Sequence, residues 1–115
     1  PILSVAAAMA SSSTTFRGIE RLRLKESDRV ETTMRMLQSF GIQCSATNSS
    51  ITVYPGKPVG GFVDSAADHR IAASAAIMAT VAEGFTTINN MDCISKSYPD
   101  FCKDFANLGG KLETE

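Results

Sequence analysis

The segment Ile71-Ala72-Ala73-Ser74-Ala75-Ala76-Ile77-Met78-Ala79 is apolar on nearly every side, and the architecture of this 115-residue chain is built around it. We predict a helix from about His69 to Ala82. A helix that is apolar almost all round is usually buried on most of its surface, because it has no polar face to turn toward water. The other elements are therefore expected to cover it.

Two more helices are predicted by apolar residues at helical spacing, one on each side of this segment. Gly41 follows the upstream helix as a natural C-terminal cap, and Ser27 or Asp28 can cap its start. The downstream helix is expected from about Tyr98 to Leu108, with Pro99 near its first turn. The upstream stripe is Val30, Met34, Leu37 and Phe40, and the downstream stripe is Phe101, Phe105 and Leu108.

Segments of β type lie between the helices, and Thr47 to Ser50 is predicted to join two of them as a hairpin. The order helix, strand, cationic loop, helix, glycine and strand occurs twice, with matching positions about 70 residues apart. If both units pack in the same sense, the N-termini of their helices point the same way. The expected strands are residues 14–19, 42–46, 51–54, 85–88 and 111–113, and residues 55–61 are expected to form a loop.

Cations stand near the start of all three helices, as Arg29, Arg70 and Lys96. A helix N-terminus already carries about half a positive charge and unpaired N–H donors, so stability alone favours acids at this position. Guanidinium groups can grip an anion through a fork of two donors, and an ammonium group adds a flexible point charge. The repeated choice of a cation therefore predicts a site for a small, highly charged anion.

Composition limits the class of protein. Apolar residues make up 43% of the chain and charged residues 20%, which is typical of a globular chain of one domain at most. The net charge is −1, so a general attraction to nucleic acids or acidic membranes is not expected. Cys44, Cys93 and Cys102 are odd in number and lack the paired spacing of zinc ligands, which favours reduced thiols in a cytoplasmic protein.

The N-terminal residues predict a helix rather than a targeting segment. Pro1 cannot be a natural initiator, so we expect the chain to have lost its beginning. The apolar run from Ile2 to Ala10 lacks the cationic region that precedes a secretory h-region. No apolar stretch reaches the roughly 18 residues of a membrane span.

Each charged feature also has a plainer interpretation. The loop from Arg17 to Arg29 holds five cations and three acids, so it could be a solvated surface loop or a nucleic-acid patch. Glu26 could be a salt-bridge partner or first-turn acid, or it could transfer protons at an anion site. His69 could be a hydrogen-bonded structural residue or a supporting group in the site. The single histidine and the absence of an acidic cluster argue against a metal site.

Three motifs closely resemble signatures of the 5-enolpyruvylshikimate-3-phosphate synthase (EPSP synthase) family. They occur in the family's order and span most of the chain. They are Arg17-Gly18-Ile19-Glu20-Arg21-Leu22-Arg23-Leu24-Lys25-Glu26-Ser27-Asp28-Arg29, Asp68-His69-Arg70-Ile71-Ala72 and Ser95-Lys96-Ser97-Tyr98-Pro99-Asp100-Phe101.

The resemblance implies an α+β fold of repeated βαβαββ units, the α-β prism of enolpyruvyl transferases, with helices buried and sheets facing outward. It implies that residues 1–115 form the C-terminal part of the C-terminal domain, without the N-terminal domain and the start of their own domain. A fragment of this kind is expected to leave sheet edges and apolar helix faces uncovered when alone.

The resemblance also implies an activity: transfer of the enolpyruvyl group of phosphoenolpyruvate to the 5-hydroxyl of shikimate 3-phosphate, with release of phosphate. No metal or organic cofactor is implied, and the longer parent is expected to be a cytoplasmic monomer. By resemblance, Lys25 contacts shikimate 3-phosphate, and Glu26 is the acid/base residue with His69 as a polar group near it. The implied phosphoenolpyruvate clamp consists of Arg29, Arg70 and Lys96.

Two departures from the family pattern leave other functions open. The family's catalytic Asp is expected just before Pro1, outside this chain, and Arg21 stands near a position where some members have a neutral side chain, so it is left out of the site. A non-catalytic folded fragment or weak anion-binding module is one alternative. A sibling enolpyruvyl transferase acting on a UDP-sugar is another, although the Lys25 to Arg29 motif argues against it.

Overall fold

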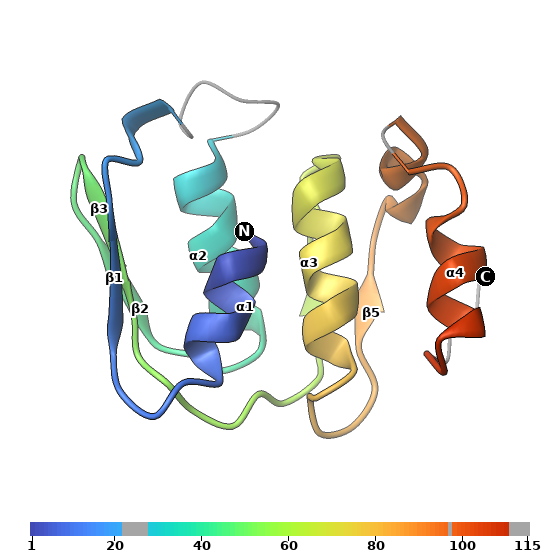
Figure 1. Ribbon diagram of the computed structural model, residues 1–115, viewed down its shortest axis with the longest axis horizontal. Coiled ribbons are helices and arrows are strands. Elements are labelled where there is room, and N and C mark those ends of the chain that lie inside the picture. The colour runs from blue at the N-terminus through green and yellow to red at the C-terminus, as the bar shows by residue number, and fades with distance from the viewer. Residues whose placement is uncertain (22–27, 97, 111–115) are drawn as a thin grey trace.

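The computed structural model describes residues 1–21, 28–96 and 98–110 of the chain, and the side chains of residues 95 and 96 are outside this description. It contains helices separated by short strands, as Figure 1 shows. In chain order the elements are α1 (Ile2–Ala8), β1 (Thr14–Arg17), α2 (Arg29–Ser39), β2 (Cys44–Ala46), β3 (Ser50–Val53), β4 (Phe62–Val63), α3 (His69–Ala79), β5 (Thr87–Ile88), the 3-10 helix η2 (Met91–Lys96) and α4 (Phe101–Asn107).

The helices α1, α2 and α3 lie side by side in the middle of the molecule, between two small sheets (Figure 1). One sheet is antiparallel with the strand order β1-β3-β2, and places Thr14 opposite Val53. The other is a parallel pair of β4 and β5, with Phe62 opposite Thr87. Buried helices flanked by outward sheets are the arrangement that the family resemblance implies.

The apolar helix α3 is buried on most sides, as its composition predicts. Ile71, Ala75 and Met78 are fully buried in the main core, to which α1, α2 and both sheets contribute. The exceptions are Arg70 at the first turn and Ile77, which is 38% exposed. The other fully or almost fully buried members of this core include Val5, Ala8, Met36, Leu37, Phe40, Ile42, Val53 and Val63.

The ends of α2 are formed by the residues that the sequence indicates. Asp28 is the N-cap, and its side chain accepts a hydrogen bond from the Glu31 backbone N–H at 3.2 Å. After the helix, Gly41 adopts a φ of +76°, a left-handed conformation that glycine enters without a Cβ clash. The hairpin between β2 and β3 is also confirmed.

Several boundaries differ from the sequence-based prediction. Helix α3 ends at Ala79 rather than Ala82, because the following backbone forms tighter turns such as Val81 N–H to Met78 C=O at 3.1 Å. Helix α4 begins at Phe101 rather than Tyr98, after a turn that contains Pro99. Strand β4 was not expected, and the predicted strand at residues 111–113 lies outside the described residues.

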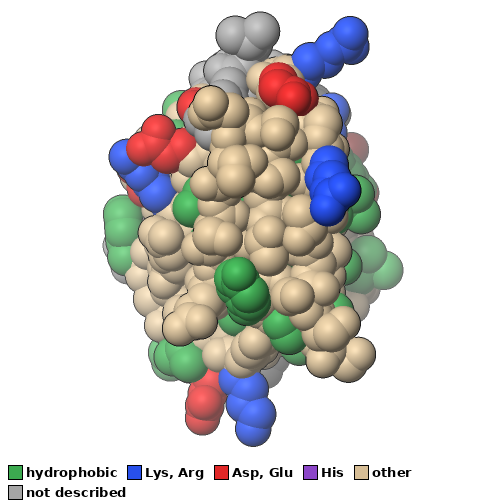
Figure 2. Space-filling model, turned by 90° about the vertical axis from the view of Figure 1, so that its left-hand side faces the viewer, with side chains coloured by type: hydrophobic (Ala, Val, Ile, Leu, Met, Phe, Trp, Pro, Cys, Tyr) green, Lys and Arg blue, Asp and Glu red, His purple; other side chains and the backbone are tan. Residues whose placement is uncertain are grey.

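The outer face of the three-stranded sheet bears few charges. Figure 2 looks onto this face and shows acidic and basic side chains scattered around it rather than gathered in one field. Thr15 and Thr52 pair across β1 and β3 through their hydroxyl groups at 2.9 Å. This face therefore lacks a concentrated patch that would suit a polyanion.

Candidate functional site

Helices α1, α2 and α3 run in the same sense, so their N-terminal ends lie at the same end of the molecule (Figure 1). This is the common direction that the sequence repeat predicts. Each of the three helices packs against the other two. Their N-terminal ends therefore lie close to one another.

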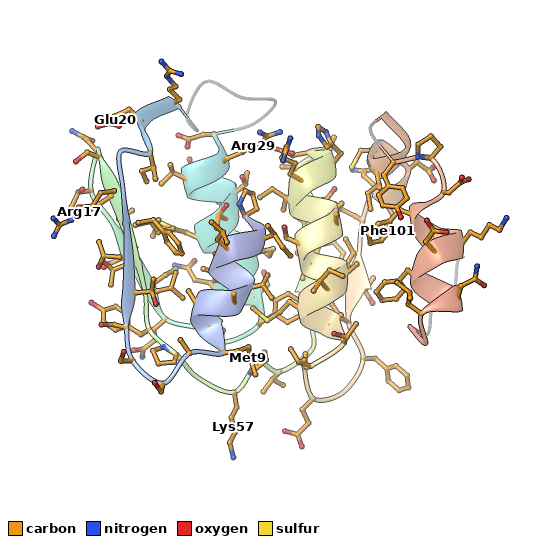
Figure 3. The ribbon with its side chains drawn as sticks, viewed as in Figure 1. Met9, Arg17, Glu20, Arg29, Lys57 and Phe101 are labelled. Atoms are coloured by element: carbon orange, nitrogen blue, oxygen red, sulfur yellow. The ribbon has the colours of Figure 1, made fainter. Side chains whose placement is uncertain are left out.

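A buried ion pair joins the starts of α2 and α3. Arg29, the first residue of α2, donates from Nε to Asp68 Oδ2 at 2.9 Å and from Nη2 to Asp68 Oδ1 at 3.3 Å. The Arg29 side chain is 6% exposed and that of Asp68 is not exposed. Figure 3 shows the Arg29 side chain at the top of α2, on the side toward α3. Two hydrogen bonds from one guanidinium group hold its plane as well as its position.

The same carboxylate is the N-cap of α3. Asp68 Oδ1 accepts a hydrogen bond from the Arg70 backbone N–H at 3.0 Å, and the Arg29 Nη2 group donates to this same atom. One buried oxygen therefore links the Arg29 side chain to the backbone of Arg70. Since Asp68 is rigidly placed at the helix start, the relative position of the two arginines is fixed through it.

The next two residues of α3 differ in their exposure. Arg70 is exposed, so its guanidinium group is accessible to a ligand from solvent. His69 is partly buried, and its Nδ1 atom is buried without a hydrogen-bond partner among the described residues. A buried polar atom of this kind is uncommon in a folded protein, and it suggests that a further group belongs next to His69.

The third predicted cation, Lys96, is the last residue of η2 rather than the start of α4. The 3-10 helix η2 packs against α3 and is anchored by the buried Ile94. Figure 1 shows this 3-10 helix beside the N-terminal end of α3. Lys25 and Glu26 lie outside the described residues.

Asp68 is the residue of this site to which sequence reasoning assigned no role. Its position directly before His69 suits an N-cap, and that was the one local signal for it. Its pairing with Arg29 bridges 39 residues of chain, and no pattern of local spacing reveals such a contact.

The described residues contain no group of three or more His, Cys, Asp or Glu side chains that could hold a metal ion. None of the helices in the described part of the chain combines the length and the apolar character that a membrane crossing requires.

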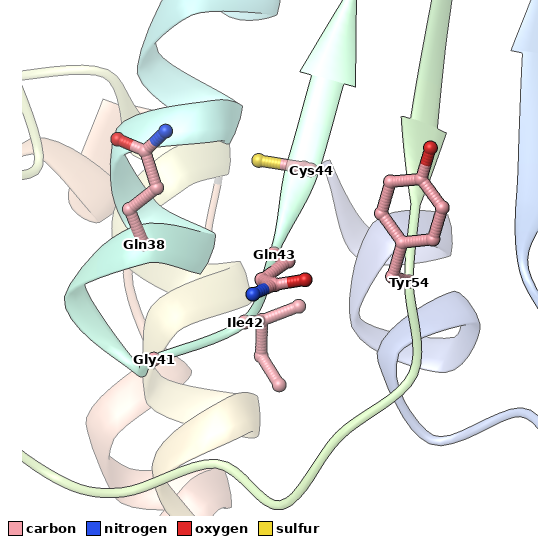
Figure 4. Close-up of a pocket in the computed structure, with 6 residues that line it drawn as sticks. All are labelled: Gln38, Gly41, Ile42, Gln43, Cys44 and Tyr54. Atoms are coloured by element: carbon pink, nitrogen blue, oxygen red, sulfur yellow. The ribbon is translucent and has the colours of Figure 1, made fainter.

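An open surface hollow of about 430 Å³ lies at the other end of α2 (Figure 4). Its position near Gln38 and Gly41 is more than two helical turns from Arg29, or about 14 Å along the axis. Burial raises the pKa of the Cys44 thiol that lines it, so this thiol stays protonated and weakly nucleophilic at neutral pH. The lining residues are Gln38, Gly41, Ile42, Gln43, Cys44 and Tyr54.

Comparison with known proteins connects the site to a family. The sequence model of the family described as EPSP synthase (3-phosphoshikimate 1-carboxyvinyltransferase) matches residues 1–105. The chain belongs to the EPSP synthase family. Its three motifs and the paired arginines at the starts of α2 and α3 are therefore features of an EPSP synthase segment.

Curated relatives and solved structures agree with this assignment. The 3-phosphoshikimate 1-carboxyvinyltransferase of Caldicellulosiruptor bescii is 45% identical over 103 residues, which cover 88% of this chain and 24% of the relative. That of Dehalococcoides mccartyi is 38% identical over 112 residues, covering 97% of this chain and 26% of the relative. A structure of EPSP synthase from Acinetobacter baumannii superposes with a TM-score of 0.93 at 33% identity, covering 98% of this chain and 27% of that one. The chain thus spans about a quarter of the length of its relatives.

Proposed function

We propose that this chain supplies the phosphoenolpyruvate side of an active site in a longer EPSP synthase, within the C-terminal part of its C-terminal domain. The reaction would join the enolpyruvyl group of phosphoenolpyruvate to the 5-hydroxyl of shikimate 3-phosphate and release phosphate. The observation that carries this proposal is the link from Arg29 through Asp68 to Arg70 at the shared end of three parallel helices. Family membership supports the same reaction.

Phosphoenolpyruvate carries a carboxylate and a phosphate, so its site needs several fixed cations. Fixed cations stabilise a charged ligand most when they need no rearrangement as the ligand binds. Asp68 supplies this rigidity for Arg29, because it holds the guanidinium group through two of its five N–H donors. The same carboxylate offsets part of the Arg29 charge, which makes the exposed Arg70 the principal anion contact.

The remaining roles follow the family motif. We propose that Lys96 completes the phosphoenolpyruvate clamp and that Lys25 contacts shikimate 3-phosphate. Glu26 would transfer protons at C3 of the enolpyruvyl group, since addition and elimination both require a proton to move there. His69 would support this step, and its buried Nδ1 atom, which has no hydrogen-bond partner in the part of the chain that the structure describes, is consistent with a neighbour supplied by a ligand or by another segment.

In this proposal, the longer EPSP synthase needs no metal or organic cofactor and acts as a cytoplasmic monomer. The three cysteines lack the paired spacing of zinc ligands, and reduced thiols of this kind fit the reducing cytoplasm. The partners are the two small-molecule substrates. The outer face of the three-stranded sheet, which Figure 2 shows, has no concentrated basic field that would favour a nucleic-acid partner.

The test replaces Arg70 by alanine in a full-length EPSP synthase that contains this chain. Residues 1–115 can also replace the matching segment of the Acinetobacter baumannii enzyme. We expect Arg70→Ala to raise the KM for phosphoenolpyruvate by roughly 100-fold, since a lost charge-assisted contact costs about 1.5–3 kcal/mol. The KM for shikimate 3-phosphate should change much less.

The matched control is Arg35→Ala, which removes an exposed arginine six residues after Arg29 along α2, where it pairs with Glu31. It should leave both KM values near those of the unchanged protein. An equal loss of affinity for both substrates in Arg70→Ala would contradict the assignment. Absence of turnover in the unchanged protein would favour a non-catalytic anion-binding module, and activity with a UDP-sugar acceptor would favour the sibling transferase.

A further inference from the structure

The loop that leads into Asp68 has an unusual backbone. Ala66 and Ala67 adopt φ values of +54° and +53°. Residues with a Cβ atom rarely enter this left-handed region, and two in succession are rarer still. A backbone of this kind persists only where the surrounding contacts hold it in place, and such strain is often found at functional sites.

The contacts that hold this loop come from the ends of the two parallel strands. Asp64 and Ser65 follow β4, and Asn89 follows β5, so the parallel pairing brings the three residues to the same edge. The Asn89 N–H continues the pairing by donating to the Val63 carbonyl at 3.2 Å. We name Asp64, Ser65 and Asn89 together the Asn89 bracket.

Asn89 uses both ends of its amide in this bracket. Its Oδ1 accepts from the Ser65 N–H at 2.7 Å, and its Nδ2 donates to Asp64 Oδ1 at 3.0 Å. Asp64 Oδ1 also accepts from the Ala66 N–H at 2.9 Å. These two bonds to the carboxylate lower the pKa of Asp64, with the bond from Ala66 as the larger cause. The Asn89 amide therefore connects the end of β5 to the turn that precedes α3.

Ser65 passes this restraint to the site. Its Oγ accepts from the Ala67 N–H at 3.2 Å, and its carbonyl accepts from the Asp68 N–H at 3.0 Å. Ser65 and Asp68 are both fully buried, so neither can exchange these bonds for water without opening the loop. Asp68 in turn binds Arg29 and caps α3 at Arg70.

We propose that Asn89 is a positioning residue for the phosphoenolpyruvate site, because its side-chain amide locks residues 64–67 and thereby sets Asp68, Arg29 and Arg70. This inference rests on the proposed function. Asn89 acts through the loop and need not touch the ligand itself. Its loss should therefore weaken phosphoenolpyruvate binding specifically, since shikimate 3-phosphate is assigned to other residues.

The experiment uses Asn89→Ala in the full-length transferase, with Asn107→Ala as the matched control at the exposed end of α4. We expect Asn89→Ala to raise the KM for phosphoenolpyruvate about tenfold, with the KM for shikimate 3-phosphate within about twofold of its original value. The Arg29 Nε–H signal in a ¹H–¹⁵N spectrum should exchange with water faster, because its acceptor Asp68 is no longer held. Asn107→Ala should change none of these quantities.

A reciprocal exchange separates positioning from simple destabilisation. Asn89→Asp places a second carboxylate beside Asp64 and should show the same defect as Asn89→Ala. The double variant Asn89→Asp/Asp64→Asn again has one amide and one carboxylate in the Asn89 bracket, so it should recover most of the phosphoenolpyruvate affinity. If Asn89→Ala fails to fold, Asp64→Ala is the second variant. It keeps the Ser65 bond to Asn89 and should raise the same KM about threefold.

The outcomes distinguish this inference from the proposed function. The inference alone is overturned if Asn89→Ala or Asp64→Ala leaves the phosphoenolpyruvate affinity unchanged while the unchanged protein turns over its substrates and Arg70→Ala shows its selective defect. Equal rises in both KM values would also overturn it, because Asn89 would then not act selectively on the phosphoenolpyruvate side of the site. No turnover in the unchanged protein would overturn the proposed function and this inference with it.

Discussion

Replacing Asp68 by asparagine tests how much the buried pair with Arg29 contributes to the fold. Asparagine is as good an N-cap as aspartate, so the bond from the Arg70 N–H can remain. The charge is lost, and an amide NH₂ group can face the Arg29 Nε–H, which is also a donor. The change therefore removes the ion pair and keeps the helix cap.

The structure sets the expected magnitude. The two side chains are 6% and 0% exposed, and removing one partner of a pair buried to this degree costs about 3–5 kcal/mol. For a unit of this size, unfolding in urea has a slope of about 1–3 kcal/mol per M, so the midpoint should fall by roughly 1–5 M. Urea unfolding followed by circular dichroism measures this shift directly.

The matched control is Glu31→Gln, which breaks the exposed pair between Glu31 and Arg35 on the same helix. These side chains are 54% and 68% exposed, so the expected loss is at most about 0.5 kcal/mol. The double variant Arg29→Met/Asp68→Asn should be more stable than Asp68→Asn, because it leaves no buried guanidinium without its carboxylate. A midpoint for Asp68→Asn equal to that of Glu31→Gln, or a double variant no more stable than Asp68→Asn, would show that the buried pair does not contribute in this way.

Two further predictions concern packing and the cysteines. Gly60→Ala would place its Cβ atom 2.2 Å from the Phe85 carbonyl oxygen, so it should lower the free energy of unfolding in urea by about 1–3 kcal/mol. In Gly56→Ala the nearest neighbour of the new Cβ atom is Ile42 Cδ1 at 3.4 Å, so this control should lose almost no stability. Equal effects of the two changes would contradict the packing of these loops. Burial raises the pKa of Cys44 above the ordinary 9.0, so the stability gained from its neutral thiol is present below that pH and is lost as the pH rises through the raised value. Mass spectrometry after brief alkylation at pH 8 should find the exposed Cys102 labelled well before Cys44. Faster labelling of Cys44 would contradict this prediction.

Much of the fold could be predicted because its signals are local. The apolar run from Ile71 to Ala79 predicts a buried helix, and Asp28 and Gly41 predict the ends of α2. The repeat predicts that successive helices start at the same end, as they do in Figure 1. Each signal acts within a few residues, so spacing along the chain is enough to find it.

The missed features depend on contacts between distant residues. Strand β4 has only two residues, Phe62 and Val63, and is defined by its parallel partner at residues 87–88. Two residues are too few to show an alternating pattern. Helix α4 starts late because Pro99 lies in a turn, although proline is also common at the first position of a helix.

The same limit applies to the candidate site. Cations at helix starts could be found from sequence, and the structure brings Arg29 and Arg70 to one end. The carboxylate that links them could not be assigned, because Asp68 acts on a residue 39 positions away. The Asn89 bracket was hidden for the same reason, since Asn89 bonds to Ser65 at a separation of 24 residues.

In the proposed function, the shared end of α1, α2 and α3 binds phosphoenolpyruvate through Arg70. Modification by an arginine-specific dicarbonyl reagent tests it most directly, with shikimate 3-phosphate present throughout and each arginine followed by peptide mass spectrometry. Phosphoenolpyruvate should slow the modification of Arg70 at least about tenfold, while the exposed Arg35 reacts at an unchanged rate. Equal rates at Arg70 with and without phosphoenolpyruvate, in a protein that turns over its substrates, would contradict the account.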